Sequence, residues 1–189
     1  MRLCIALLGL LTLLSCAPRL LEDQAAANLV VRNVTVDTSA ITGVAGRKMD
    51  FDVSPAQIKA DLTAALRNKL RATPQGHGDV TVKITSVRLM SRMQEMMLGG
   101  ASYVQGTLMV ADTVTGQQIV PPTKVFATSQ RLRVGGPIGA AVAPTAKQDY
   151  HETLESFAMN VLVRLSPRNN AMVAADSPAV KAGRVKIAQ

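Results

Sequence analysis

Two stretches of the chain repeat apolar residues at helical spacing. The first follows Ser54 and Pro55, and its apolar positions are Ile58, Leu62, Ala65, Leu66 and Leu70. The second extends from about Lys147 to Leu165, with apolar positions Tyr150, Leu154, Phe157, Ala158, Val161, Leu162 and Leu165. Apolar residues three or four apart form one stripe on a helix, so each stretch predicts a helix that buries a single face.

Both predicted helices begin at a capping signal. Ser54 and Thr145 are each followed three residues later by glutamine, at Gln57 and Gln148. In a capping box the hydroxyl accepts from the amide at the third helical position, and that residue's side chain reaches back to the cap amide. Prolines at positions 74 and 167 mark where the two helices end.

Four further stretches predict strands. They are rich in β-branched residues or alternate apolar with polar residues, and they cover 29–36, 79–84, 103–111 and 125–134. After Ser86 the apolar phase shifts by one residue, which indicates a β-bulge. The run from Asp112 to Gly116 predicts a turn with glycine at a positive-φ position. Pro121 and Pro122 predict an interruption between Ile119 and the strand that begins at Val125.

The order of these elements is strand, helix, three or four strands, helix. Strands joined by short turns are antiparallel neighbours, and helices with apolar stripes need a sheet to cover. The chain therefore predicts an α+β two-layer sandwich, with a mostly antiparallel sheet of four to five strands and two helices on one face. This domain should extend over residues 29–166.

The N-terminus reads as an export signal. Arg2 precedes an apolar run from Leu3 to Leu14, which is too short to span a bilayer as a helix. The run closes with Leu13-Leu14-Ser15-Cys16, and a small residue followed by cysteine resembles the lipobox of bacterial lipoproteins. We expect residues 1–15 to be a signal peptide, Cys16 to be acylated, and 16–28 to form a tether. The alternative is an ordinary secretory signal with a chance cysteine.

Cysteine content and charge narrow the function further. Cys4 would leave with the signal and Cys16 would carry lipid, so the mature domain would have no thiol for catalysis, disulfides or metals. The formal net charge is +8, but the chain has no Trp, three Phe and two Tyr, which argues against nucleic-acid binding. Anionic lipid or glycolipid is the natural neighbour of such a charge in the cell envelope, and simple solubility is the alternative.

Candidate catalytic residues are sparse. His77 and His151 are the only histidines, and neither has another histidine at metal-ligand spacing. Asp50 and Asp52 form a carboxylate pair of the kind found on solvated loops. The sequence contains no nucleophile elbow, phosphate loop or dinucleotide fingerprint. We therefore expect no enzyme activity, no cofactor and no metal.

A methionine-rich segment lies between two predicted strands. Met90, Met93, Met96 and Met97 precede Gly99-Gly100. Methionine is flexible and polarisable, so these residues are candidates for binding a partner. The alternative is that some of them fill the core below a hairpin. The uncharged apolar stretch 134–146 could contact a bilayer or a protein, or form a loop.

With the lipobox at Cys16, the two capped helices and the Asp112–Gly116 turn, the chain resembles a known family. These are small Gram-negative lipoproteins of uncharacterised function whose domain is similar to the N-terminal domain of TolB. The same sandwich occurs in the lipopolysaccharide-assembly lipoprotein and in auxiliary lipoproteins of ABC-type transport systems. The resemblance implies acylation of Cys16. Ala17 stands where aspartate would favour inner-membrane retention, which implies the outer membrane.

The expected function is that of a lipid-anchored envelope lipoprotein, which binds an envelope protein partner in assembly or transport and is not an enzyme. One alternative is a periplasmic hydrolase with an unmarked site, for which Asp50, Asp52 and His151 are the only candidates. Another is a structural module that docks on peptidoglycan or glycolipid. It would use the basic tail 167–189, whose cations are Arg168, Lys181, Arg184 and Lys186.

Overall fold

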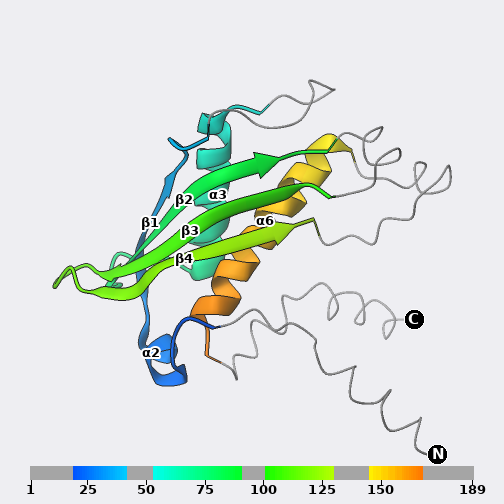
Figure 1. Cartoon of the computed structure of the whole chain (residues 1–189). Helices are drawn as coiled ribbons and strands as arrows, with labels where there is room; N and C mark the ends of the chain where they lie inside the picture. Colours follow the sequence, from blue (N-terminus) through cyan, green and yellow to red (C-terminus); the bar gives the residue numbers. More distant parts are fainter. Residues whose placement is uncertain (1–18, 42–52, 91–100, 130–144, 168–189) are drawn as a thin grey trace, which may run out of the picture.

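The fold is a four-stranded sheet with two long helices against one of its faces (Figure 1). We describe a computed structural model that covers residues 19–41, 53–90, 101–129 and 145–167. The strands are β1 (Val31–Asp37), β2 (Gly78–Arg88), β3 (Tyr103–Asp112) and β4 (Gln118–Thr128). The helices are α2 (Asp23–Asn28), α3 (Pro55–Leu70) and α6 (Ala146–Leu165). The predicted α+β sandwich is confirmed.

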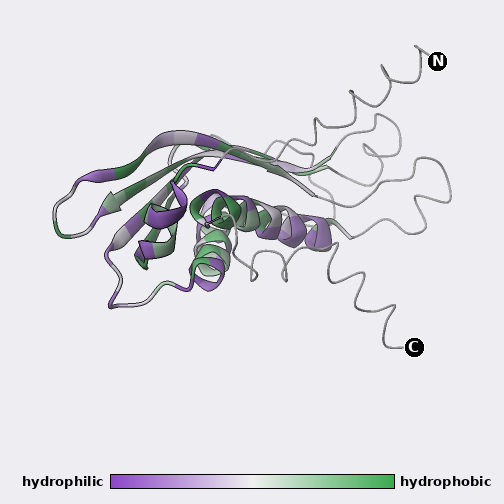
Figure 2. Ribbon diagram, turned by 90° about the horizontal axis from the view of Figure 1, so that it is seen from below, coloured by the Kyte–Doolittle hydropathy of each residue, from purple (hydrophilic) through white to green (hydrophobic). Residues whose placement is uncertain are grey.

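The strands lie in the spatial order β1-β2-β3-β4. β2, β3 and β4 are antiparallel neighbours, whereas β1 pairs with β2 in parallel. The parallel pair follows from the connection, because α3 carries the chain from one end of the sheet back to the other. Figure 2, seen from below, shows both long helices on the same side of the sheet.

The core lies between the sheet and the two helices. The helical stripes predicted from the sequence supply it, with Ile58, Leu62 and Leu66 of α3 and Phe157 and Val161 of α6 fully buried. The strands contribute the inward positions of their alternation: Val80, Val82, Ile84, Val104, Leu108, Val110, Val120 and Val125. The register of β2 against β3 shifts between Ile84 and Ser86, which places the bulge where the sequence predicted it.

The two helix caps differ from each other. Thr145 and Gln148 form the complete capping box, with Gln148 N donating to Thr145 Oγ1 at 3.2 Å and Gln148 Oε1 accepting from Thr145 N at 2.9 Å. Ser54 Oγ accepts from Gln57 N at 3.1 Å, as predicted. The predicted reach of the Gln57 side chain back to the cap is wrong, because its Nε2 donates instead to Asp61 Oδ1 at 2.8 Å.

The predicted break at Pro121-Pro122 is also wrong, since β4 runs through both prolines. β4 is an edge strand, so an amide missing on its outer side breaks no hydrogen bond of the sheet. On the inner side the register shifts between the pairs Leu108–Thr123 and Val110–Val120. Pro121 and Pro122 therefore lie opposite the single residue Met109 and form a β-bulge. The second missing amide falls within this bulge, where the regular hydrogen bonding of the strands is already interrupted.

The expected tether is described only from Arg19 onward, and this part lies on the domain. It contains α2, whose Ala26 is buried, and Leu20, Leu21 and Leu29 pack against the core. No helix in the described parts of the chain is long and apolar enough to cross a membrane. Residues 1–15 and the basic tail from Arg168 onward lie outside the described residues.

Candidate partner-binding site

Most of the site residues predicted from the sequence lie outside the described residues: Cys16, Met93, Met96, Met97, Asp50 and Asp52. Met90 is described and is 6% exposed. Its amide donates to Ser102 Oγ at 2.9 Å, so both its side chain and its backbone belong to the folded domain. This is the position that the core-filling alternative expects for Met90.

A buried polar cluster stands at the end of the sheet where the methionine-rich segment begins. Ser102 Oγ accepts from Met90 N and hydrogen-bonds to Asp149 Oδ2. The carbonyl of Ser102 accepts from Ser129 N at 3.2 Å, and the carbonyl of Asp149 accepts from Thr153 Oγ1 at 2.7 Å. The four side chains concerned are all buried: Ser102, Ser129, Asp149 and Thr153.

These bonds tie together the segment after β2, the residue before β3, the residue after β4 and the first turn of α6. Asp149 suits its place, since a carboxylate is favoured in the first turn of a helix. Met90, Ser102, Ser129 and Asp149 therefore meet at one corner of the domain. No sequence pattern predicts this cluster, because Ser102 and Asp149 are 47 positions apart and neither belongs to a local motif.

The histidines lie apart from this cluster. His151 is exposed on α6, with its ring centroid 5.1 Å from that of Tyr150. His77 is half-buried in the turn before β2, and its carbonyl accepts from Thr113 N at 2.8 Å. Within the described ranges, no group of three or more His, Cys, Asp or Glu could hold a metal ion.

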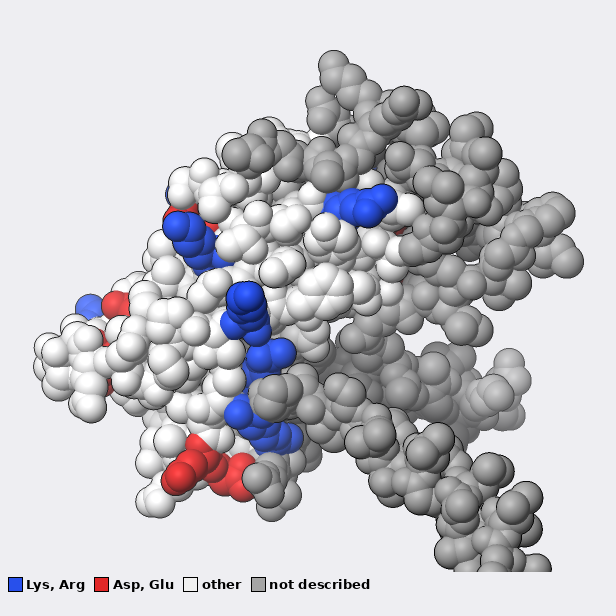
Figure 3. Space-filling view, in the orientation of Figure 1, with Lys and Arg blue, Asp and Glu red and all other residues white. Residues whose placement is uncertain are grey.

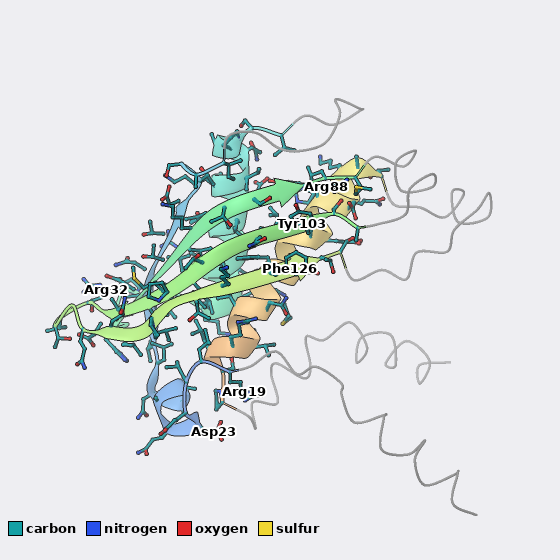
Figure 4. All side chains as sticks on the ribbon, in the orientation of Figure 1. Arg19, Asp23, Arg32, Arg88, Tyr103 and Phe126 are labelled. Carbon is teal, nitrogen blue, oxygen red and sulfur yellow. The ribbon has the colours of Figure 1, made fainter. Side chains whose placement is uncertain are left out.

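The face of the sheet opposite the helices carries an aromatic pair. Tyr103 of β3 and Phe126 of β4 have ring centroids 5.6 Å apart with the planes tilted by 37°, and Phe126 is 50% exposed. Arg88 of β2 is the register partner of Tyr103 and is exposed. Figure 4 shows the three residues on neighbouring strands at the same end of the sheet.

Sequence reasoning missed this aromatic pair, although a signal was present. Tyr103 and Phe126 both point outward from the sheet. Val104, which follows Tyr103, and Val125, which precedes Phe126, are fully buried. An aromatic residue on the outward phase of an amphipathic strand is a departure from alternation. Tyrosine, phenylalanine and arginine are also the side chains enriched in the centres of protein interfaces.

Another corner of the domain is formed where the first and last described residues meet. Leu20 N donates to Arg164 O at 3.0 Å, and Arg19 Nη1 donates to Ser166 O at 3.1 Å. Arg164 Nη1 in turn donates to the carbonyl of Lys124 in β4 at 3.2 Å. Backbone carbonyls therefore link Arg19, Arg164 and Lys124 to one another around the C-terminal end of α6, and we call these three residues the basic corner.

Comparison with known proteins shows similarity only at the level of solved structures. No protein-family profile and no curated protein matches the chain. A protein of Caulobacter crescentus CB15 that is assigned as a lipoprotein is 11% identical with a TM-score of 0.37, over 82% of this chain and 96% of that one. PelC of Paraburkholderia phytofirmans, described as a dodecamer, is 12% identical with a TM-score of 0.40, over 82% and 96%.

A Xanthomonas campestris protein of the family DUF330 is 6% identical with a TM-score of 0.38, and the match covers 93% of this chain and 94% of that one. Identities and TM-scores this low assign no function to the chain.

Proposed function

We propose that this chain is a bacterial envelope lipoprotein, anchored by acyl chains on Cys16, whose domain binds an envelope protein and catalyses no reaction. One observation carries the proposal: a basic residue and a short apolar run lead to Leu13-Leu14-Ser15-Cys16. Lipoproteins of this type carry more than one acyl chain, and two or more chains make membrane attachment stable.

The described residues support a binding role. Tyr103, Phe126 and Arg88 offer aromatic and cationic contact area on the uncovered face of the sheet. By contrast, the hydrogen-bonded Ser102–Asp149 pair is buried, so the Ser102 hydroxyl does not face a substrate in solvent. Neither of the two alternatives, a hydrolase or a tail that docks on glycolipid, gains a positive observation from the described residues.

The anchor is tested by Cys16→Ala, with Cys4→Ala as the matched control. We expect the Cys16→Ala variant to leave the membrane fraction after a high-salt wash, whereas Cys4→Ala stays in it and carries the mass of the acyl chains on its first residue. Membrane retention of Cys16→Ala, or a natural product with an unmodified thiol, would refute the anchor.

A separate experiment tests which of the two membranes holds the protein. Ala17 follows the cysteine, and we propose the outer membrane as the location. In a density gradient of cell envelopes the lipoprotein should travel with the outer membrane, and Ala17→Asp should shift it to the inner membrane. Equal distribution of both proteins would show that this sorting rule does not apply to the chain.

Binding of a partner is tested by placing a photo-crosslinking amino acid at Phe126. The matched control position is Ala64, which is exposed on α3. We expect a discrete crosslinked protein from position 126 and none of the same mass from position 64. A similarity of role to TolB-like domains or to transport auxiliaries would follow only if that protein belongs to such a system.

A further inference from the structure

The segment that follows the proposed anchor is fixed to the domain. Leu20 N and Arg19 Nη1 donate to the carbonyls of Arg164 and Ser166, at 3.0 and 3.1 Å. Behind these bonds, Leu20, Leu21 and Leu29 pack against the core and Ala26 of α2 is buried. The point at which the domain is attached is therefore Arg19, at the C-terminal end of α6.

Only a short length of chain separates this point from the proposed lipid. Arg19 is three residues after Cys16, and three residues of extended chain reach at most about 11 Å. If the acyl chains of Cys16 lie in the hydrocarbon layer, Arg19 must lie at the depth of the headgroups or just above them. The basic corner is then the part of the domain nearest the bilayer.

The basic corner itself carries three positive charges, which favour contact with an anionic surface. Figure 3 shows Lys and Arg side chains in a column that descends across this face, with acidic side chains directly below it. The basic corner contributes Arg19, Lys124 and Arg164, whereas α2 and its cap contribute Glu22 and Asp23.

We infer that the basic corner rests on the anionic phospholipid headgroups of the leaflet that holds Cys16, with α2, which directly follows Arg19 in the chain, close to that surface. The domain is then held in one orientation instead of turning freely on a tether. Figure 4 shows Arg19 and Arg88 at opposite sides of the molecule. In this orientation the end of the sheet with Arg88 and its register partner Tyr103 lies on the side away from the membrane, where it faces a partner. The inference rests on the proposed anchor.

The orientation is tested with the full acylated protein in vesicles of phosphatidylethanolamine and phosphatidylglycerol. A fluorophore is attached to Gln24→Cys, at an exposed position of α2, or to Arg88→Cys at the far end. A lipid with a spin label on its headgroup quenches nearby fluorophores. We expect quenching at position 24 to exceed that at position 88 by at least threefold.

Equal quenching at both positions, with the protein still bound after a high-salt wash, would overturn the orientation and leave the anchor intact. Loss of the protein from the vesicles during that wash would overturn the proposed anchor and the orientation with it.

The role of charge is tested by reversing it at this corner. Arg19→Glu with Lys124→Glu should reduce quenching at position 24 by about half or more. Lys83→Glu with Arg88→Glu makes the same change in net charge on β2 and should leave that quenching unchanged. An equal reduction by both pairs would show that total charge matters and the basic corner does not.

Discussion

The hydroxyl of Tyr150 in α6 donates to Oδ2 of Asp61 in α3 at 2.8 Å, which joins the two long helices by a polar contact. The other carboxylate oxygen of Asp61 accepts from Gln57 Nε2 at 2.8 Å. Tyr150 is buried, and burial, reinforced by its bond to Asp61, raises the pKa of its phenol well above the usual range. Asp61 thus connects the first turns of α3 to the start of α6.

Tyr150→Phe should lower the free energy of unfolding by about 1–2 kcal/mol, because it removes a hydrogen bond to a charged group and leaves the ring in place. Chemical denaturation measures the loss. The matched control is Tyr103→Phe, whose hydroxyl lies on the uncovered face and should matter little. In a double-mutant cycle, Tyr150→Phe should cost less stability when Asp61 is already replaced by Asn. Additive losses would show that the two groups are not coupled.

The raised pKa of Tyr150 can be read directly in a Tyr103→Phe background, where Tyr150 is the only tyrosine. Its phenolate absorbance should appear only at a pH well above 10, or abruptly when alkali unfolds the protein. A smooth titration centred near pH 10 in the folded protein would contradict the buried hydrogen bond.

Ser102→Ala should destabilise the domain by about 2 kcal/mol, because it leaves both Met90 N and the buried Asp149 carboxylate without their serine partner. Thr85→Ala is the control, since the exposed Thr85 hydroxyl donates a single hydrogen bond, to the carbonyl of Gln105. Hydrogen exchange should show the loss first at Met90 N. A loss no larger than that of the control would mean that the buried cluster does not hold this corner.

Gly106→Ala should cost about 1–3 kcal/mol, because the new Cβ would lie 2.7 Å from the carbonyl oxygen of Lys83 in the neighbouring strand. Gly78→Ala is the matched control. Its Cβ would meet the end of the Leu29 side chain, which can rotate aside, so its loss should be smaller. Thermal unfolding of the two variants distinguishes them, and equal losses would argue against the close approach of β2 to β3.

Acid should weaken the β3–β4 hairpin through Asp112. Its Oδ1 accepts from Thr115 N at 2.8 Å and from Val114 N at 2.9 Å, and these bonds lower the pKa of the carboxyl below 3.8. Because the folded pKa is depressed, the stabilisation is present above the unfolded value of about 3.9 and is lost as the pH falls through the folded value. Stability should therefore decrease below about pH 4.

The control for this effect is Asp112→Asn, which keeps an oxygen acceptor for the turn but does not titrate. Its stability should change less between pH 4 and pH 2 than that of the natural protein. Some dependence should remain, since Ser39 N holds the pKa of Asp37 low in the same way. Identical pH profiles for the two proteins would rule out Asp112 as a contributor.

Sequence patterns predicted those features of the fold that depend on residues close together in the chain. The stripe of Ile58, Leu62 and Leu66, the cap at Thr145 and the positive φ of Gly116 each depend on residues close in sequence, and all are confirmed. Gln57 instead donates to Asp61, one turn later in the same helix, because a hydrogen bond to a charged carboxylate is stronger than one to a neutral group of the cap.

The missed features depend on strands and helices that meet only in the folded chain. The continuity of β4 through Pro121 needs the bulge opposite Met109, and no pattern within residues 118–128 reveals that bulge. The same holds for the candidate site. Cys16 could be named from its own flanks, but the contact between Tyr103 and Phe126 requires the register of two paired strands.

The paired prolines of β4 affect how readily two copies of the protein can associate through the edges of their sheets. An outer strand with all its amides in place invites another chain to extend the sheet, which is how many aggregates begin. The proline pair removes a donor from that border, and the exposed Lys124 adds a charge that a docking strand would have to bury. Under the proposed membrane anchor, molecules at high local density would crowd together without their sheets fusing.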